Sequence, residues 1–479
     1  MLFPTVAFAV FFVVAFAANW SMPSRGDMWR VTMLGFSLFF YAWWNPYGPE
    51  ATWWWRPFAL LLVASVVGNF IVGRLVGNAM PHGERTRKSR RYVVLGVSAN
   101  LGLLGYFKYY ALFTTTLANS LNRIGLDWDI PLLNVILPVG ISFYTFQAIS
   151  YVVDVGRGDS KSMRLLDLGV YLTFFPQLVA GPIVRVREFI PQMNTRANPA
   201  AVQSARAIGL ITGGLFKKVV ISSYLASNIV DPVFNQPDDR SAQEVIMAVY
   251  GYAIQIYADF SGYTDIAIGA ALLLGFSFPD NFDSPYRALS VNEFWRRWHM
   301  TLSRWLRDYL YFPLGGNRGS RMFVYRNLML VMLIGGLWHG AAWNFVVWGG
   351  IHGSMLVWER WTSDRGLSMG LAPWVRWLLT FNIVCLAWVF FRAASFSDAM
   401  LMLSRLVHFG ESPLVTVGVV AVIVLTLAAQ FLPPGWADVP RKRFGDLPWV
   451  AQGAIFGLAL MLISALGPVG VSPFIYFQF

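Results

Sequence analysis

Three of the five histidines lie where an ionisable side chain is unexpected, and His339 is the clearest case. It follows Gly335-Gly336-Leu337-Trp338 and precedes Gly340-Ala341-Ala342, inside a long apolar run. In a membrane segment such a group is costly and by default marks a functional site. Its imidazole can act as a general base near neutral pH, and the flanking glycines allow a substrate or another backbone to approach closely. A histidine hydrogen-bonded within a helix bundle explains the same pattern equally well.

His299 belongs to a different kind of segment, in which tryptophans and arginines are interleaved from Phe294 to Trp305. The i, i+4, i+7 spacing predicts that Trp295, His299 and Leu302 share one face of a continuous helix. This pattern is typical of a helix at a membrane surface, with tryptophans at headgroup depth and arginines that reach phosphates. It also fits a second catalytic histidine beside an arginine-rich site for an anionic donor, because the planar guanidinium offers paired donors to phosphate.

His352 lies thirteen residues beyond His339. On one ideal helix this spacing separates the two by about 20 Å and places them on nearly opposite faces. A shared metal would require a helix break, for which Gly349-Gly350 is the candidate position. No Cys or carboxylate stands at ligand spacing, so we expect no metal site. We interpret His82 and His408 as loop residues.

The sequence contains no motif for a covalent nucleophile. It has neither a Gly-x-Ser-x-Gly elbow nor a phosphate-cradling Gly-x4-Gly-Lys-Ser/Thr loop, and its single cysteine, Cys385, lies in an apolar stretch. Direct attack by an acceptor hydroxyl needs only a histidine base and a polarised acyl carbonyl. We expect Asn344, near His339, and Arg304 or Asp308 to help orient or stabilise the reactants.

The elements that hold these groups must be membrane helices. Of the 479 residues, 56% are apolar and only 13% are charged, whereas an ordinary soluble domain has about 25% charged residues. Counting about 17 to 25 apolar residues per crossing, the sequence predicts an all-α polytopic protein with about ten to twelve transmembrane helices and further re-entrant or interfacial ones. The candidate runs lie near residues 1–19, 31–47, 58–80, 92–117, 131–153, 166–184, 208–230, 244–276, 328–358, 375–392, 414–432 and 448–468.

Basic residues predict which loops face the cytoplasm. The formal net charge is +12, and the positive-inside rule places the basic clusters at residues 85–91 and 441–443 in the cytoplasm. Counting back from the first cluster puts the N-terminus and the Trp53-Trp54-Trp55 loop outside, together with the loop that contains Asp127 and Asp129. Residues 1–19 lack the positively charged start of a signal peptide, so we interpret them as a retained first span.

Asp259 and Asp265 fall inside an apolar run, where only protein or water can shelter them. They motivate a second hypothesis, a transporter for polysaccharide or lipid-linked sugar, although the paired broken helices of two related halves are not found. A non-catalytic scaffold for a secretion complex would explain the spans but not the histidines. No repeat or linker interrupts the chain, so we predict one membrane domain, 1–479, with N-terminal spans 1–130, a core at 131–360 and C-terminal spans 361–479.

The arginine excess between Arg287 and Arg326 is interleaved with tryptophans and apolar helices. This setting favours acidic membrane lipid and acyl-donor phosphates as partners, and it argues against nucleic acid.

Several motifs together resemble the membrane-bound O-acyltransferase superfamily, most closely its bacterial branch of alginate O-acetyltransferase membrane subunits. They cover the chain from about residue 135 to its end, with gaps, and such a series is far more specific than any one motif. The motifs are Phe174 to Ile183, Tyr257 to Asp265, Phe282-Asp283-Ser284-Pro285-Tyr286 to Gly315-Gly316-Asn317-Arg318, Leu337-Trp338-His339-Gly340 and Phe474 to Phe479.

The resemblance implies a helical shell with a central funnel or tunnel in the cytoplasmic (inner) membrane of a bacterium. It implies that His339 is catalytic and that His299 is the second active-site histidine. The implied donor is acetyl-CoA from the cytoplasm, with no bound cofactor, and the acetyl group passes to extracytoplasmic acetyltransferase partner proteins or to an exported polysaccharide such as alginate. We expect contacts with donor or acceptor from Arg296, Arg297, Arg304, Asp308, Trp338 and Asn344.

A sister group resembles the chain in the same motifs. It comprises the D-alanyl transfer proteins of teichoic acid modification, which take the acyl group from a small carrier protein. That group tends to be shorter, so the additional C-terminal crossings from about residue 414 favour the alginate-like branch.

Overall fold

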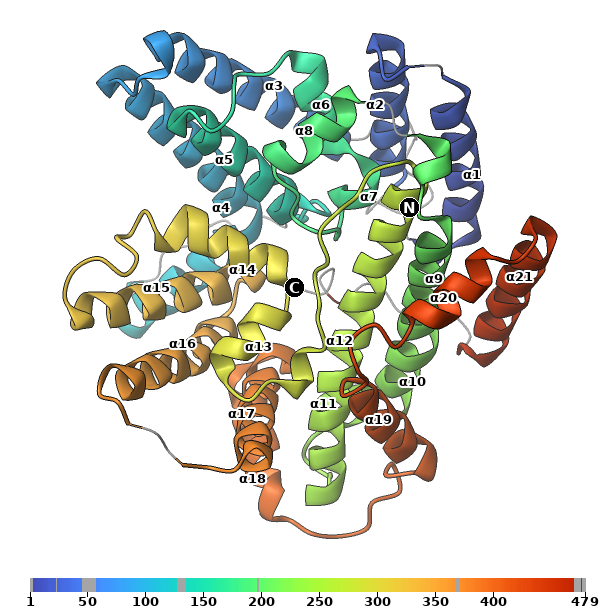
Figure 1. The fold of residues 1–479 in the computed structure, drawn as a ribbon. Coiled ribbons are helices and arrows are strands. Elements are labelled where there is room, and N and C mark those ends of the chain that lie inside the picture. The colour runs from blue at the N-terminus through green and yellow to red at the C-terminus, as the bar shows by residue number, and fades with distance from the viewer. Residues whose placement is uncertain are drawn as a thin grey trace. The chain divides into compact units, whose positions relative to one another are not determined.

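In the part of the chain that the computed structural model describes, every regular element is a helix and none is a strand (Figure 1). This confirms the predicted all-α class. The described residues are 3–22, 24–44, 57–126, 135–195, 198–367, 370–468 and Ile475. The Trp53-Trp54-Trp55 loop, Asp127, Asp129 and the C-terminal motif other than Ile475 lie outside them.

Internal contacts divide the chain into two units. Unit 1 comprises Met1–Gln203 with Ala270–Pro279, and unit 2 comprises Ser204–Gly269 with Asp280–Phe479. The single membrane domain stays a prediction.

Five helices among the described residues are long and apolar enough to cross a membrane, and two shorter apolar helices, Val6–Ser21 and Val417–Ala429, accompany them. The number of crossings therefore stays a prediction. The five are Pro57–Asn78, Ser204–Phe234, Arg321–His339, Pro373–Arg392 and Trp449–Leu466.

Unit 1 is built mainly from long helices that coincide with the apolar runs. Its helices are α1 (Val6–Ser21), α2 (Asp27–Ala42), α3 (Pro57–Asn78), η1 (Pro81–Gly83), α4 (Arg87–Arg123), α5 (Ile141–Arg157), α6 (Leu165–Thr173), α7 (Phe175–Leu178), α8 (Val186–Asn194) and η2 (Pro199–Ala201). The start of α4 illustrates how the sequence sets a boundary. Thr86 and Ser89 form a reciprocal capping box, in which each side chain accepts the other residue's backbone N–H.

The apolar run at residues 166–184, one of the candidate crossings, does not form one continuous helix. Its crossing of the membrane stays a prediction. Phe174 leaves the helical conformation, with ψ 112°, and ends α6. Pro176 then lies in the first turn of α7, where its missing N–H costs nothing. After α7 the chain passes through Gly181-Pro182, which does not continue the helix. Apolar composition predicted burial correctly here but not one continuous helix.

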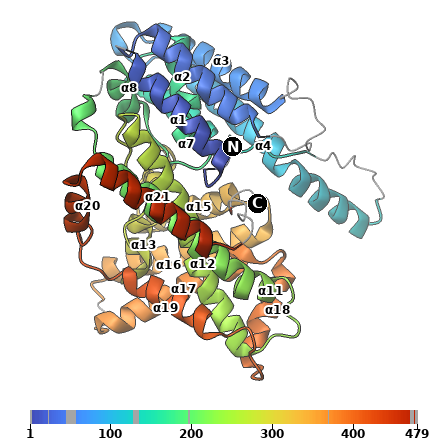
Figure 2. The ribbon, with the colours of Figure 1, turned by 90° about the vertical axis from the view of Figure 1, so that its right-hand side faces the viewer.

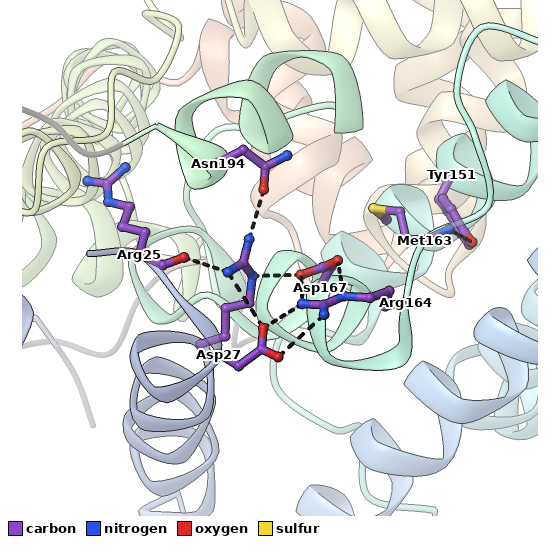
Figure 3. A network of polar contacts seen from close by, with 8 residues as sticks. Arg25, Asp27, Tyr151, Met163, Arg164, Asp167 and Asn194 are labelled. Atoms are coloured by element: carbon purple, nitrogen blue, oxygen red, sulfur yellow. Dashed lines mark hydrogen bonds and ion pairs between the residues drawn. The ribbon is translucent and has the colours of Figure 1, made fainter.

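A network of ion pairs connects the start of α2 with α6 in unit 1 (Figure 3). Arg30 Nε lies 2.7 Å from Asp167 Oδ1, and Arg164 Nη2 lies 2.6 Å from Asp27 Oδ1. Arg164 also pairs with Asp167 at 3.1 Å. Arg25 completes the group, because its guanidinium donates to the carbonyl of Leu274 at 2.9 Å, just beyond the end of α12. We call Arg25, Asp27, Arg30, Arg164 and Asp167 the arginine network.

Unit 2 holds the remaining helices and most of α12. These are α9 (Ser204–Leu215), η3 (Phe216–Ser222), α10 (Ser223–Leu225), η4 (Ala226–Val230), α11 (Asp231–Phe234), α12 (Ala242–Leu273), η5 (Pro285–Arg287), α13 (Val291–Arg297), α14 (Met300–Leu306), η6 (Arg307–Tyr311), α15 (Arg321–His339), α16 (Trp343–Asp364), α17 (Pro373–Arg392), α18 (Phe396–Ser404), η7 (Arg405–Val407), α19 (Val417–Ala429), α20 (Asp438–Gly445) and α21 (Trp449–Leu466).

The helix that begins with α9 runs beside α12 (Figure 1 and Figure 2). A Cβ on Gly214 would lie 2.6 Å from the carbonyl oxygen of Gly262, so only glycine permits this approach. In the π-helical segment η3 that follows, Lys217 pairs with Asp265 at 2.5 Å and Lys218 pairs with Asp259. Protein therefore shelters the buried carboxylate of Asp259. The Asp265 side chain is 25% exposed, and its charge is paired with Lys217.

The helices α15 and α16 form a tight antiparallel hairpin. A Cβ on Gly336 would lie 2.2 Å from the carbonyl oxygen of Phe345, and one on Gly349 would lie 2.4 Å from that of Met332. The chain reverses at residues 340–342, directly after His339. The break proposed at Gly349-Gly350 is therefore in the wrong place, because these glycines serve close helix packing inside α16.

Candidate functional site

Three buried histidines of unit 2 are connected by two tryptophans. The ring centroids of His299 and Trp338 lie 6.3 Å apart, and those of Trp338 and His339 lie 4.8 Å apart. Trp348 continues the series, with its centroid 5.0 Å from His339 and 4.9 Å from His352. The three histidines are at most 3% exposed. We call these five residues the histidine–tryptophan cluster.

Further aromatic side chains enclose this cluster. The Phe391 ring of α17 lies 5.4 Å from His339, and the Phe260 ring of α12 lies 4.7 Å from His299 at an interplanar angle of 87°. Trp295 Nε1 donates a hydrogen bond of 3.3 Å to His352 Nδ1. Aromatic edges and faces provide weak electrostatic contacts and exclude water. Interactions with charge that develops during a reaction are stronger in such a water-excluded site than in water.

The position of His339 follows from the hairpin. It is the last residue of α15, and its side chain meets Trp348 of the returning helix α16. The turn is tight, because a Cβ on Gly340 would lie 1.9 Å from the Phe345 ring. The glycines flanking His339 thus permit close backbone packing, one of the two uses that the sequence suggested for them.

His299 does not lie on a continuous helix, so its predicted face shared with Trp295 and Leu302 is wrong. It stands between α13 and α14 with φ 42° and ψ 54°, in the left-handed region. This conformation costs a residue with a Cβ about 1–2 kcal/mol. Burial lowers the pKa of the His299 imidazole below its usual value, which favours the neutral ring.

Asn281 holds this strained segment from a distant part of the chain. Its side-chain Oδ1 lies 3.1 Å from His299 Nδ1, and it accepts hydrogen bonds from the Thr301 backbone N–H at 3.2 Å and the Thr301 hydroxyl at 2.9 Å. The Asn281 backbone carbonyl accepts from the N–H of Met300 at 3.0 Å. Four contacts with residues 299–301 therefore offset the strain at His299.

The structure brings together His299, His339 and Trp338 of the predicted site residues. Two others have structural partners: Arg297 pairs with Asp283 at 2.8 Å, and Asn344 donates to the Ala393 carbonyl at 2.9 Å.

The remaining three predicted contacts lie along the same segment of unit 2. Asp308 of η6 pairs with Arg307 at 2.7 Å. Arg296 is exposed at the end of α13, and Arg304 is half-buried in α14. The ion pair of Asp308 already accounts for its charge, whereas the exposed guanidinium of Arg296 is accessible to an anion.

Sequence reasoning missed Asn281 and Trp348, and it assigned His352 no role beside His339. Asn281 directly precedes the Phe282-Asp283-Ser284-Pro285-Tyr286 motif, and this was the only signal that could have drawn attention to it. Trp348 stands four residues before His352, so helical spacing predicts their contact but not the contact with His339. Among the described residues, no three His, Cys, Asp or Glu side chains are arranged to hold a metal ion.

Comparisons with known proteins agree with the motifs. Residues 154–397 match the membrane-bound O-acyltransferase family. A probable alginate O-acetylase from Azotobacter vinelandii is 36% identical over 489 residues, which cover 94% of each chain. The peptidoglycan O-acetyltransferase of Helicobacter pylori is 39% identical and covers 85% of this chain and 78% of its own. The teichoic acid D-alanyltransferase of Bacillus subtilis is 28% identical and covers 55% of this chain and 70% of its own. The predicted resemblance is confirmed: this multi-pass membrane protein belongs to the membrane-bound O-acyltransferase family and is an O-acyltransferase.

Proposed function

We propose that this O-acyltransferase transfers acetyl groups from cytoplasmic acetyl-CoA to an exported polysaccharide such as alginate, in the inner membrane of a bacterium. The observation that carries the proposal is the burial of His299 and His339 in one aromatic cluster, where Trp338 contacts both rings. The relatives named as acetyltransferases match most of the chain, and this supports acetyl as the acyl group.

In the proposed reaction, His339 acts as the general base. A hydroxyl oxygen of the acceptor attacks the carbonyl carbon of the thioester, while His339 takes the hydroxyl proton. The new C–O bond forms, the C–S bond of the donor breaks, and the proton passes from the imidazolium to the departing thiolate. Protons and electrons balance without a covalent enzyme intermediate, in agreement with the absence of a nucleophile motif from the sequence.

The anionic donor requires cations, and the segment from α13 to α15 supplies them. Arg296 is exposed at the end of α13, and Arg318 and Arg321 are exposed before and at the start of α15. Guanidinium groups suit the phosphates of acetyl-CoA because each offers paired donors. We propose that these arginines lie on the donor side, and that extracytoplasmic partner proteins receive the acetyl group or present the acceptor.

The test compares wild type with His339→Ala and His299→Ala in the native host lacking its own copy. Each variant is matched for membrane abundance, and ester-linked acetate on the secreted polysaccharide is quantified. His408→Ala serves as the control, because His408 is exposed and its imidazole Nδ1 lies 3.1 Å from the carbonyl of Ser404, four residues earlier. We expect acetate to fall by about 10²–10⁴-fold in the His339 variant, and to stay at the wild-type level in the control.

Unchanged acetate in both variants at equal abundance would overturn the proposal. The donor is tested separately with labelled acetyl-CoA added to membrane vesicles of defined orientation. Label transfer only when the cytoplasmic face is accessible supports the proposed direction. Ester-linked D-alanine on the envelope polymer, with acetate unaffected, would instead support the D-alanyl alternative.

A further inference from the structure

The three polar contacts on Asn281 Oδ1 determine the orientation of its amide. A backbone N–H can only donate, and that of Thr301 points at this atom from 3.2 Å. The atom in that position must therefore be the oxygen, because a rotated amide would set an NH₂ group against an N–H. The Thr301 hydroxyl, 2.9 Å away, donates to the same oxygen. The hydrogen-bond donors around this atom thus determine the orientation of the amide.

The orientation of Asn281 in turn determines the tautomer of His299. An amide oxygen has no proton to donate, so the hydrogen bond of 3.1 Å requires that His299 Nδ1 carry the proton. In the neutral ring, which burial favours, Nε2 then holds the lone pair. Phe260, Trp338 and Asn281, which contact the ring, carry no charge and do not titrate near neutral pH.

We infer that Asn281 is a positioning residue that locks His299 in the Nδ1–H tautomer, so that His299 acts in acyl transfer as a hydrogen-bond or proton acceptor through Nε2. This inference rests on the proposed function for its catalytic meaning. It gives His299 a defined role: in the neutral state it accepts from a hydroxyl or thiol of a reactant and does not donate to the acyl carbonyl. His339 remains the general base of the proposed reaction.

The other amide atom of Asn281 makes a sharp test available. Asn281 is 1% exposed, and its Nδ2 has no hydrogen-bond partner among the described residues. Asn281→Asp therefore has a side chain of similar shape, keeps an oxygen that accepts hydrogen bonds, and loses no hydrogen bond at Nδ2. It adds a negative charge beside His299 Nδ1. A nearby carboxylate stabilises the imidazolium and raises the pKa of His299. Asn281→Leu removes the acceptor altogether.

The experiment measures the pH dependence of kcat/KM for acetyl transfer by membranes of wild type, Asn281→Asp and Asn281→Leu. Activity that needs Nε2 unprotonated is lost as the pH falls through the pKa of His299. We expect Asn281→Asp to move the acidic limb to higher pH by about one unit or more, and Asn281→Leu to lower kcat by about 10–100-fold with little change in KM. Asn292→Asp is the control, because it adds the same charge at an exposed site of α13 and should leave the limb in place.

A second readout does not depend on activity. Nitrogen NMR of the purified protein labelled at its histidine rings, with His299 assigned by the spectrum of His299→Gln, distinguishes a protonated Nδ1 from a protonated Nε2. A proton on Nε2 in wild type, or an unchanged acidic limb in an active Asn281→Asp variant, would overturn the inference. Wild-type membranes that transfer no acetyl group, with Nδ1 protonated, would count against the proposed function and leave the tautomer assignment standing.

Discussion

The arginine network of unit 1 and the histidine–tryptophan cluster of unit 2 bury ionisable groups in opposite ways. In the network, the Arg30 guanidinium lies 2.7 Å from Asp167 and donates to the Arg25 carbonyl, so its charge is compensated within the fold. In the cluster, His339 is contacted by Trp338, Trp348 and Phe391, which carry no charge. A group whose charge is already paired stabilises structure, whereas an imidazole enclosed by aromatic rings can serve as a base toward a bound reactant.

Among substitutions that test this comparison, we expect the largest effect at Trp348, whose ring lies between His339 and His352. Trp348→Ala should lower the free energy of unfolding by about 3–5 kcal/mol because it creates a cavity. It should also lower kcat by about 10²-fold, because the rings of His339 and His352 lose the side chain that packs against both and holds their positions. Trp348→Phe should keep most of the activity, since Trp348 Nε1 has no hydrogen-bond partner in the described structure. Thermal unfolding in detergent and the rate of acetyl transfer per folded molecule measure both effects. Equal loss in the two variants would contradict a role based on the aromatic ring.

Substitutions in the arginine network should change stability without changing catalysis. Arg30→Met leaves the carboxylate of Asp167, which is 17% exposed, with weaker compensation, and should cost about 3 kcal/mol of unfolding free energy. Arg164→Met is the matched comparison: its side chain is 58% exposed, so the cost should be at most about 1 kcal/mol. Activity per folded molecule should be unchanged in both. A lower kcat in fully folded Arg30→Met would contradict the view that the arginine network affects stability alone.

The smallest expected effects separate two adjacent glycines of α16. Gly349→Ala sets a methyl group 2.4 Å from the Met332 carbonyl oxygen and should cost about 1–3 kcal/mol. Gly350→Ala meets only the Leu333 side chain at 3.9 Å, and the helix preference of alanine should make it neutral or stabilising by up to about 1 kcal/mol. The midpoints of thermal unfolding compare the two. Similar midpoints would show that the hairpin tolerates a wider spacing than the structure has.

Local pattern in the sequence predicted much of the fold. The apolar runs at 58–80, 375–392 and 448–468 coincide closely with α3 (Pro57–Asn78), α17 (Pro373–Arg392) and α21 (Trp449–Leu466). The prediction of one helix over residues 166–184 failed, because the helix ends at Phe174 and the chain does not continue as a helix through Gly181, although the neighbouring residues are apolar. A hydropathy pattern reports burial, and only the backbone conformation at such residues decides whether a helix continues.

The sequence predicted only part of the candidate site, because local pattern again did not determine backbone conformation. An ionisable residue amid glycines and apolar side chains identified His339, and the segment rich in arginine and tryptophan identified His299. Neither pattern predicted the left-handed conformation of His299. Nor did either predict the hydrogen bond between His299 and Asn281, which lies eighteen residues earlier in the chain. Hydrogen bonds across a loop depend on where two helices begin, which spacing along the chain does not state.

By itself, the sequence determined the class of protein, the apolar helices and the histidines capable of chemistry, because composition and local spacing govern burial and helix formation. Tertiary structure alone decided that α15 and α16 fold back after His339, that Trp348 links His339 with His352, and that Asn281 orients His299. Each of these contacts joins residues that several turns or a loop separate, so each depends on the close packing of one helix against another.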